Sequence, residues 1–179
     1  MAGRFHIGAG ASPHPFGAPD RGGPPLEWPS AQAAAEPELQ AFADHWRTHC
    51  GPDGAPAPRS ALDPLTLPRA MLGRLILSER EGPRRYRYRL FGTEMRDVLG
   101  RELTGKPLDA ETMDGALEPF LDMLETVVSE RRPVFLSGSI WWEGRAYRTF
   151  HQVTAPFRAS DAPPDALPRF VCTLVCFPA

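Results

Sequence analysis

The sequence predicts an α+β fold in which one five-stranded antiparallel sheet packs against helices from the middle of the chain. Five segments have the two-residue alternation or the short apolar run that is typical of strands. Hairpin-like connections link the last three of them, so these strands are expected to be antiparallel. The helical segments fall between the second and third strands, which is the arrangement of an α+β domain. The predicted strands are residues 74–80, 85–90, 133–142, 146–157 and 169–177.

The composition favours one domain and gives no global field that would hold nucleic acid or an anionic membrane. The chain has 179 residues, a formal net charge of −2 and a pI of about 6.2. Its three cysteines are an odd number and do not suggest a disulfide framework. No signal peptide and no membrane-length apolar run is visible in the sequence. We therefore expect a cytoplasmic protein that neither binds nucleic acid nor inserts into a membrane.

Three parts of the chain differ in composition. Residues 1–35 are rich in Gly, Pro and Ala and are expected to be a flexible tail. Residues 36–60 contain an N-terminal helix followed by a Pro- and Gly-rich linker, and residues 61–179 contain the folded domain.

The N-terminal helix is predicted to be amphipathic. Its apolar side chains recur at the spacing of one helical stripe. The stripe consists of Leu39, Phe42, Ala43 and Trp46. We expect a homodimer that forms through this helix and the sheet, with Leu39, Phe42 and Trp46 as contacts.

The segment RRYRYRL, residues 84–90, has two interpretations. On a nucleic-acid surface, the basic and aromatic side chains would share one exposed face. A strand instead places successive side chains on opposite faces. We favour the strand, with Glu79 and Glu81 on the neighbouring strand offsetting the outward charge. The inward side chains are then Tyr86, Tyr88 and Leu90, and the outward ones are Arg85, Arg87 and Arg89.

Two helices are predicted in the middle of the chain. Thr93 is expected to cap a short helix, EMRDVLG, which ends at Gly100. Residues 114–132 have the strongest helical pattern, and Pro133 ends it. The buried face of this longer helix consists of Leu117, Phe120, Leu121, Leu124, Val127 and Val128.

The final strand is apolar on both of its faces. One face carries Cys172, Leu174 and Cys176, and the other carries Val171, Val175 and Phe177. The mid-chain helices can cover one face, so the N-terminal helix or a second subunit must cover the other. Cys172 and Cys176 lie about 13 Å apart on a strand, too far for a disulfide.

Three segments resemble a known family. They are LPRAMLGRLILSER (67–80), YRYRLFGTEMRDVLGRELTGKPL (86–108) and RRPVFLSGSIWWEGRAYRTFHQVTAPF (131–157). Together with the strand order, they resemble the PAS-like domain common in alphaproteobacteria, PAS family 5, over about residues 39–177. The resemblance implies a sensory or protein-interaction module of a bacterial signalling pathway, which acts through a partner protein or through dimer rearrangement.

The resemblance also bears on cofactors. In haem-binding relatives the iron ligand typically comes from the helical segment, which is also where flavin-binding relatives carry their photoreactive cysteine. Residues 92–132 contain neither His nor Cys, so haem and flavin are disfavoured and no cofactor is expected. An unidentified small ligand remains open.

A PAS-like sheet would place a ligand cavity between its strands and its helices. The strands would contribute Tyr86, Tyr88 and Leu90, and the helices would contribute Met95, Leu99, Leu121 and Leu124. Polar tips would come from Trp142, Tyr147 and His151. The alternative is a filled core, which is common in a domain of this size.

Catalytic and metal sites are not expected. His45 and His49 share one helix face, a spacing that can bind a metal, but no distant ligand cluster accompanies them. His151 is expected to be a strand histidine that a neighbour satisfies. The sequence has no nucleophile elbow, phosphate loop or zinc-hydrolase motif. The competing function is a small-molecule-binding enzyme or carrier, which would need a perturbed titratable group in a polar cavity.

Overall fold

The strands form one antiparallel sheet in the computed structural model, which describes residues 3–4, 26–113, 117–140 and 148–178. Its long members are the five predicted strands, in the order β5-β6-β7-β3-β4, and the two-residue strands β2 and β1 continue the sheet beyond β5. Because β3 pairs with β7, the first hairpin and the last three strands share this sheet. The predicted α+β architecture is confirmed. The strands are β1 (Gly3–Arg4), β2 (Glu27–Trp28), β3 (Leu75–Gly82), β4 (Arg85–Phe91), β5 (Val134–Ile140), β6 (Arg148–Phe157) and β7 (Phe170–Cys176).

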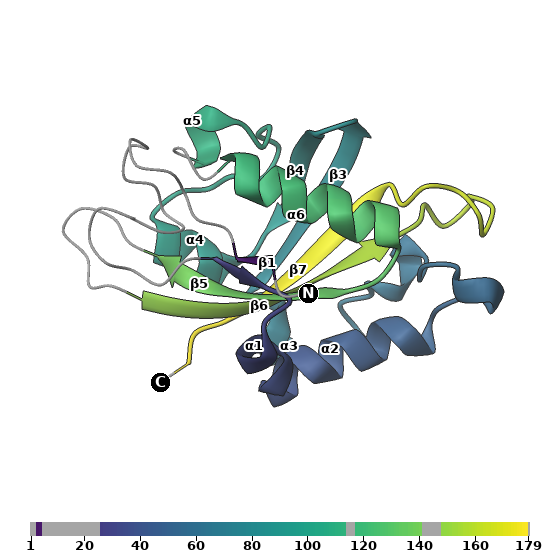
Figure 1. The fold of residues 1–179 in the computed structure, drawn as a ribbon, viewed down its shortest axis with the longest axis horizontal. Coiled ribbons are helices and arrows are strands. Elements are labelled where there is room, and N and C mark those ends of the chain that lie inside the picture. The colour runs from purple at the N-terminus through teal and green to yellow at the C-terminus, as the bar shows by residue number, and fades with distance from the viewer. Residues whose placement is uncertain (1–2, 5–25, 114–116, 141–147, 179) are drawn as a thin grey trace.

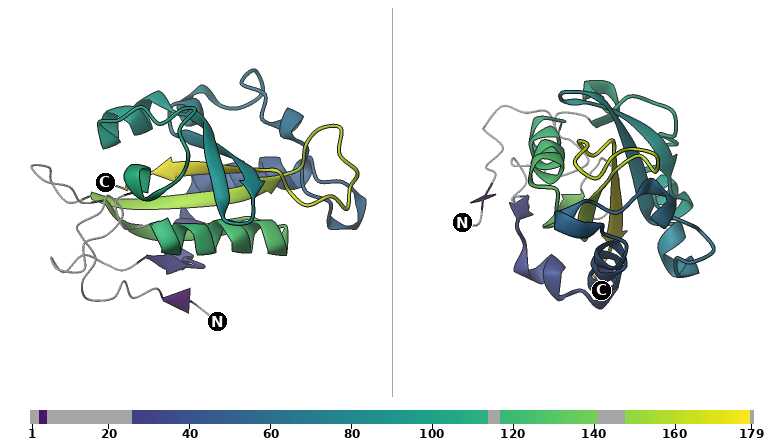
Figure 2. Two further views of the ribbon diagram at one scale, coloured as in Figure 1. Left: turned by 90° about the horizontal axis from the view of Figure 1, so that it is seen from above. Right: turned by 90° about the vertical axis from the view of Figure 1, so that its right-hand side faces the viewer.

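Helices cover both faces of the sheet, as Figure 1 and Figure 2 show. We call the face under α6 the inner face and the face under α1 and α2 the outer face. No helix in the described part of the chain has the length and apolar content needed to cross a membrane. The helices are α1 (Ala31–Ala35), α2 (Pro37–Thr48), α3 (Arg69–Leu72), α4 (Thr93–Leu99), α5 (Ala110–Met113) and α6 (Leu117–Glu130).

The inner face is covered by the apolar stripe of α6. All members of the predicted stripe are buried except the half-buried Leu117. They share one apolar cluster with Phe150 of β6 and with Val171 and Val175 of β7. Each large apolar side chain that is buried contributes about 1.5–3 kcal/mol, so this packing holds α6 on the sheet.

The outer face is covered by the N-terminal helix of the same chain. Leu39, Phe42 and Trp46 of α2 are buried in a second cluster that includes Phe157 of β6 and Leu174 of β7. The expected dimer contacts are therefore already used inside the chain, and the structure corrects that assignment. An apolar sheet face needs a cover, and a helix attached to the same chain supplies it without the entropy cost of association.

Residues 26–35, which we assigned to the flexible tail, form β2 at the edge of the sheet beside β5 and α1 on the outer face. The Oγ atoms of Ser30 and Ser137 lie 2.8 Å apart, and Ser30 also caps α1 by accepting from the Ala33 amide. Ala33 is fully buried. Small side chains allow this close approach, although a sequence rich in Ala and Pro shows no hydrophobic stripe that would predict it.

The β4 strand confirms the predicted orientation of its tyrosines but not of its leucine. Tyr86 and Tyr88 are buried on the inner face, whereas Leu90 is 40% exposed. Leu90 pairs with Leu77 while Tyr88 pairs with Ser78, so Arg89 is an extra residue in a β-bulge. The alternation reverses after the bulge, and Phe91 instead of Leu90 turns inward.

The short helix α4 begins one residue earlier than predicted. Gly92 is its N-cap residue and Thr93 its first helical residue, so Thr93 is not the cap. The predicted end is confirmed, because Gly100 adopts a left-handed conformation with φ of 69°.

Two of the outward arginines of β4, Arg87 and Arg89, form ion pairs with β3, as the sequence suggested. Arg87 Nε lies 2.5 Å from Glu81 Oε1, and Arg89 Nε lies 2.5 Å from Glu79 Oε2. Arg169 on the other side of β3 also contacts Glu79, at 2.5 Å. The segment of residues 84–90 is therefore a half-buried strand in which Arg87 and Arg89 are paired with β3 across the outer surface of the sheet.

Candidate functional site

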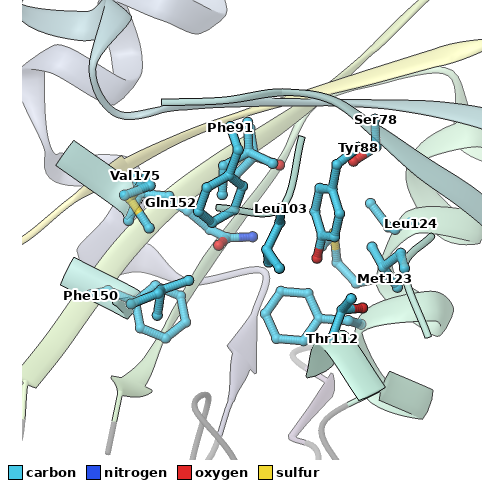
Figure 3. A pocket seen from close by; sticks show the side chains of 16 residues that line it. Ser78, Tyr88, Phe91, Leu103, Thr112, Met123, Leu124, Phe150, Gln152 and Val175 are labelled. Atoms are coloured by element: carbon cyan, nitrogen blue, oxygen red, sulfur yellow. The ribbon is translucent and has the colours of Figure 1, made fainter. Parts of the chain in front are cut away.

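A cavity of about 40 Å³ lies between the inner face of the sheet and the mid-chain helices. Figure 3 shows its wall, with Leu103 between Gln152 of β6 on one side and Tyr88 of β4 on the other. The space is too small for a haem or flavin, because sites for molecules of that kind measure about 300–1,000 Å³. It has room for a few small atoms or one or two water molecules.

The cavity wall is almost entirely apolar. Its polar groups belong to Ser78, Tyr88, Thr112, Gln152 and Thr173, and none of the described lining residues is Asp, Glu, Lys, Arg or His. Burial raises the pKa of the Tyr88 hydroxyl, so the wall carries no charge at neutral pH.

One polar chain crosses from β6 to β7 beside the cavity. Gln152 Nε2 donates to Thr154 Oγ1 at 3.2 Å, and the hydroxyl oxygens of Thr154 and Thr173 lie 2.8 Å apart. Thr154 and Thr173 are directly opposite in the ladder, which brings their side chains to the same face. This chain fixes the Gln152 side chain, whose amide group reaches the cavity (Figure 3).

The structure brings together only part of the expected cavity. Four expected residues line it: Tyr88, Met95, Leu99 and Leu124. Leu121 is buried in the same cluster without lining the cavity, and Leu90 turns outward because of the bulge. Trp142 and Tyr147 lie outside the described residues.

The inner face of β6 was not identified from the sequence. Phe150 and Gln152 line the cavity, whereas His151 between them points to the outer face. Alternation along the strand correctly places Phe150 and Gln152 on one face and His151 on the other, but it does not tell which of the two faces α6 covers. Gln152 is therefore one of the polar lining residues that were not predicted, together with Ser78, Thr112 and Thr173.

A hydrogen-bond network at the end of the cavity ties α6 to the first hairpin. Glu125 of α6 accepts from the Tyr86 hydroxyl at 2.6 Å and from Arg80 Nε and Nη2 at 3.1 Å each. The backbone amide of Arg84 donates to the same carboxylate at 3.1 Å. Burial by itself raises the pKa of Glu125, but these donors outweigh burial and hold the pKa below its usual range. Tyr86 thus anchors α6 instead of lining the cavity.

His151 lies on the outer face and contacts the start of α2. Its Nδ1 lies 2.9 Å from Oε1 of Glu36, and the side chain is 9% exposed. Cys176 is its direct cross-strand neighbour. Burial, followed by the hydrogen bond to Glu38, raises the pKa of Cys176 to about 12, so its thiol stays protonated at neutral pH. The contact between His151 and Glu36 holds the start of α2 on the sheet, and the Cys176 thiol beside it is not an activated nucleophile.

His45 and His49 use their ring nitrogens locally. His45 Nε2 lies 2.8 Å from the carbonyl oxygen of Ala61, and His49 Nδ1 lies 2.8 Å from that of His45. Within the ranges that the structure describes, no three His, Cys, Asp or Glu side chains form a group that could hold a metal ion.

A second, more open hollow of about 690 Å³ lies where the ends of α2 and α6 meet the loop before β7. Its lining includes three arginines and three acids, namely Arg47, Arg131, Arg132, Asp53, Glu130 and Asp165. Because the two signs of charge balance, this hollow favours no particular class of ligand.

An antiparallel sheet with five long strands that packs against mid-chain helices around a small uncharged cavity defines a class of compact α+β domains. Comparison with protein families names that class. The family described as PAS domain, PAS family 5, matches residues 34–170, about three quarters of the chain, and the chain belongs to this family. No curated protein and no solved structure matched it. The resemblance seen in the sequence is thus confirmed, and PAS domains in general are sensory or interaction modules and not catalysts.

Proposed function

We propose that this chain is a sensory module of a bacterial signalling pathway that holds a small neutral ligand in its inner cavity. The observation that carries the proposal is the chemistry of the cavity wall. None of its 16 described side chains is charged, and Gln152, Thr173 and Ser78 provide hydrogen-bonding groups. A charged ligand would lose its hydration there without gaining a counterion, which is strongly unfavourable.

The ligand that fits this wall is small and mostly apolar, with one group that can exchange a hydrogen bond with the Gln152 amide. Met95 and Met123 line the cavity from α4 and α6. Methionine side chains are flexible and adapt to irregular space, so they allow the cavity to expand around a ligand.

Ligand binding would act by a population shift. A molecule that prefers one packing of the helices against the sheet moves the balance between two arrangements of the domain. The output then passes to a partner protein or changes self-association. The three free cysteines suit a reducing compartment, which supports a cytoplasmic location for the module.

Native mass spectrometry of the purified full chain tests the proposal. We expect a bound neutral mass that is lost on denaturation. Leu99→Phe on α4 would fill the cavity and remove this mass, while Leu90→Phe, the same change on the outer side of β4, would keep it.

The proposed ligand binding would be refuted if the wild-type chain carries no small molecule and no small neutral compound stabilises it in a thermal-shift screen. If Leu99→Phe and Leu90→Phe retain the same bound mass, the ligand sits elsewhere on the domain.

A further inference from the structure

We propose that the turn formed by Gly73 and Arg74 couples the cavity to the N-terminal helix, with Arg74 as the positioning residue. The turn joins α3 to β3, and its backbone contacts α4. The Arg74 side chain contacts Glu38 of α2, and its Nε also lies 3.6 Å from Oε2 of Glu94 in α4. The inference rests on the proposed function, because it assigns the route by which an occupied cavity changes the position of α2.

On the side of the cavity, the turn fixes the first residues of α4. The carbonyl oxygen of Gly73 accepts from the amides of Glu94 at 2.9 Å and Met95 at 3.3 Å. Met95 is fully buried and lines the cavity. A ligand that displaces Met95 therefore pulls on the same residue whose amide holds Gly73.

The backbone of Gly92 is in direct van der Waals contact with the backbone of Gly73. A Cβ atom on Gly92, the N-cap of α4, would lie 2.2 Å from the carbonyl oxygen of Gly73. The Gly92 amide also donates to the Leu75 carbonyl at 2.9 Å. With no side chain between them, α4 and the turn have little room to move independently.

On the outer side, the Arg74 side chain reaches the start of α2. Its Nη2 lies 2.5 Å from Oε1 of Glu38, which is in the first turn of that helix. Its Nη1 donates to Cys176 Sγ at 3.3 Å, and Cys176 in turn donates to Oε2 of Glu38 at 3.4 Å. Arg74 is 15% exposed as a side chain, so solvent screens this pair less than a pair on the open surface.

The turn is also bonded to the sheet at a cavity residue. The Val175 amide donates to the Arg74 carbonyl at 3.3 Å, and Arg74 Nη1 donates to the Val175 carbonyl at 3.4 Å. The Val175 side chain lines the cavity. Arg74 thus belongs to the turn that holds α4, and it also contacts a cavity strand and the start of α2.

The coupling is expected at the start of α2 and not along the whole helix. Leu39 and Phe42 are fully buried on the outer face, so the middle of α2 is held by apolar packing. Glu38 is a third exposed as a side chain, which leaves the first turn free to respond when the Arg74 contact changes.

Xenon is a suitable probe, because it is neutral and apolar, enters dry cavities reversibly and does not need the natural ligand to be known. The experiment is a xenon-pressure titration of the full chain followed by amide chemical shifts. In the wild type we expect xenon to shift the amides of α4 and, in parallel, those of Glu38 and Leu39.

Two substitutions, Arg74→Gln and Glu38→Gln, remove the ion pair between Arg74 and Glu38, each from one of its partners. In either variant we expect the α4 shifts to persist and the shifts at the start of α2 to be lost. Arg87→Gln is the matched control, because it removes an Arg–Glu pair of the same 2.5 Å length that does not touch the turn. This control should keep the α2 response.

The outcomes separate the two proposals. Xenon shifts on α4 without any at Glu38 in the wild type would overturn the coupling and leave the ligand cavity standing. An unchanged α2 response in both Arg74→Gln and Glu38→Gln would also overturn it. If xenon shifts no amide around the cavity, the cavity does not admit an apolar guest and the proposed function itself fails.

Discussion

The hydroxyl of Tyr86 donates a 2.6 Å hydrogen bond to Oε1 of Glu125 and thereby joins β4 to α6. Tyr86 is 2% exposed, and Arg80 donates to the same carboxylate. This contact explains why aromatic and basic side chains alternate in the Arg/Tyr segment. The tyrosines build and anchor the inner side of the sheet, and Arg87 and Arg89 pair with glutamates of β3 on its outer side.

Tyr86→Phe should destabilise the fold by about 1.5 kcal/mol, the lower end for a hydrogen bond to a charged group. The ring stays in place, and Arg80 and the Arg84 amide still hold Glu125. Urea unfolding monitored by circular dichroism measures the change. Glu118→Gln, which removes an acid that is 73% exposed, is the control and should change stability by less than about 0.5 kcal/mol. Equal effects of the two changes would contradict the anchoring role of Tyr86.

Acid should destabilise the domain through its paired glutamates. Burial raises the pKa of Glu79, but the hydrogen bonds from Arg89 and Arg169 outweigh burial and lower it below its ordinary value of 4.5. A carboxylate with a lowered folded-state pKa contributes stability that is complete above its unfolded-state pKa and is lost as the pH falls through the folded-state value. The free energy of unfolding should therefore fall below about pH 4.5.

The test compares the wild type with Glu79→Gln between pH 7 and pH 3. The variant should be less stable at pH 7, because Arg89 and Arg169 lose their charged partner. Its stability should also fall less steeply with acid. A wild-type curve that is flat through this range would show that the outer ion pairs contribute nothing to stability.

Phe42→Ala should cost about 3–5 kcal/mol, because Phe42 is fully buried against the outer face of the sheet. The loss should not depend on protein concentration, since the contacts lie within one chain. Unfolding curves at two concentrations that differ tenfold measure this. A midpoint that rises with concentration in the wild type and not in Phe42→Ala would instead support the dimer that the sequence suggested for this helix.

These results show which features a sequence pattern can predict. The stripes of α2 and α6 and the alternation of β4 up to Tyr88 follow from periodicity, because side-chain direction repeats with the backbone. The orientation of Leu90 does not follow, since one inserted residue in a bulge reverses the alternation without any signal in the composition.

The candidate site was predicted where an amphipathic helix defined it and, at Tyr88, where the alternation of β4 defined it. Met95, Leu99 and Leu124 were identified because an amphipathic helix has one apolar face. The strands β6 and β7 are apolar on both faces, and each face is covered by a different helix. Tertiary packing alone decides that Gln152 faces the cavity and His151 faces α2, so the polar centre of the site could not be derived from the pattern.

Gln152→Leu separates the polar role of the cavity from its role in packing. Leucine is of similar size, and Thr154 and Thr173 keep their mutual 2.8 Å contact, so stability should change by less than about 1 kcal/mol. Retention of the small neutral ligand should fall by about tenfold, because one hydrogen bond is worth about 1.4 kcal/mol in binding. Xenon, which makes no hydrogen bond, should bind as it does in the wild type.

Native mass spectrometry and the xenon titration measure the two effects side by side. A parallel loss of both would mean that leucine at this position fills the cavity, and undiminished retention of the ligand would remove the Gln152 amide from the binding site.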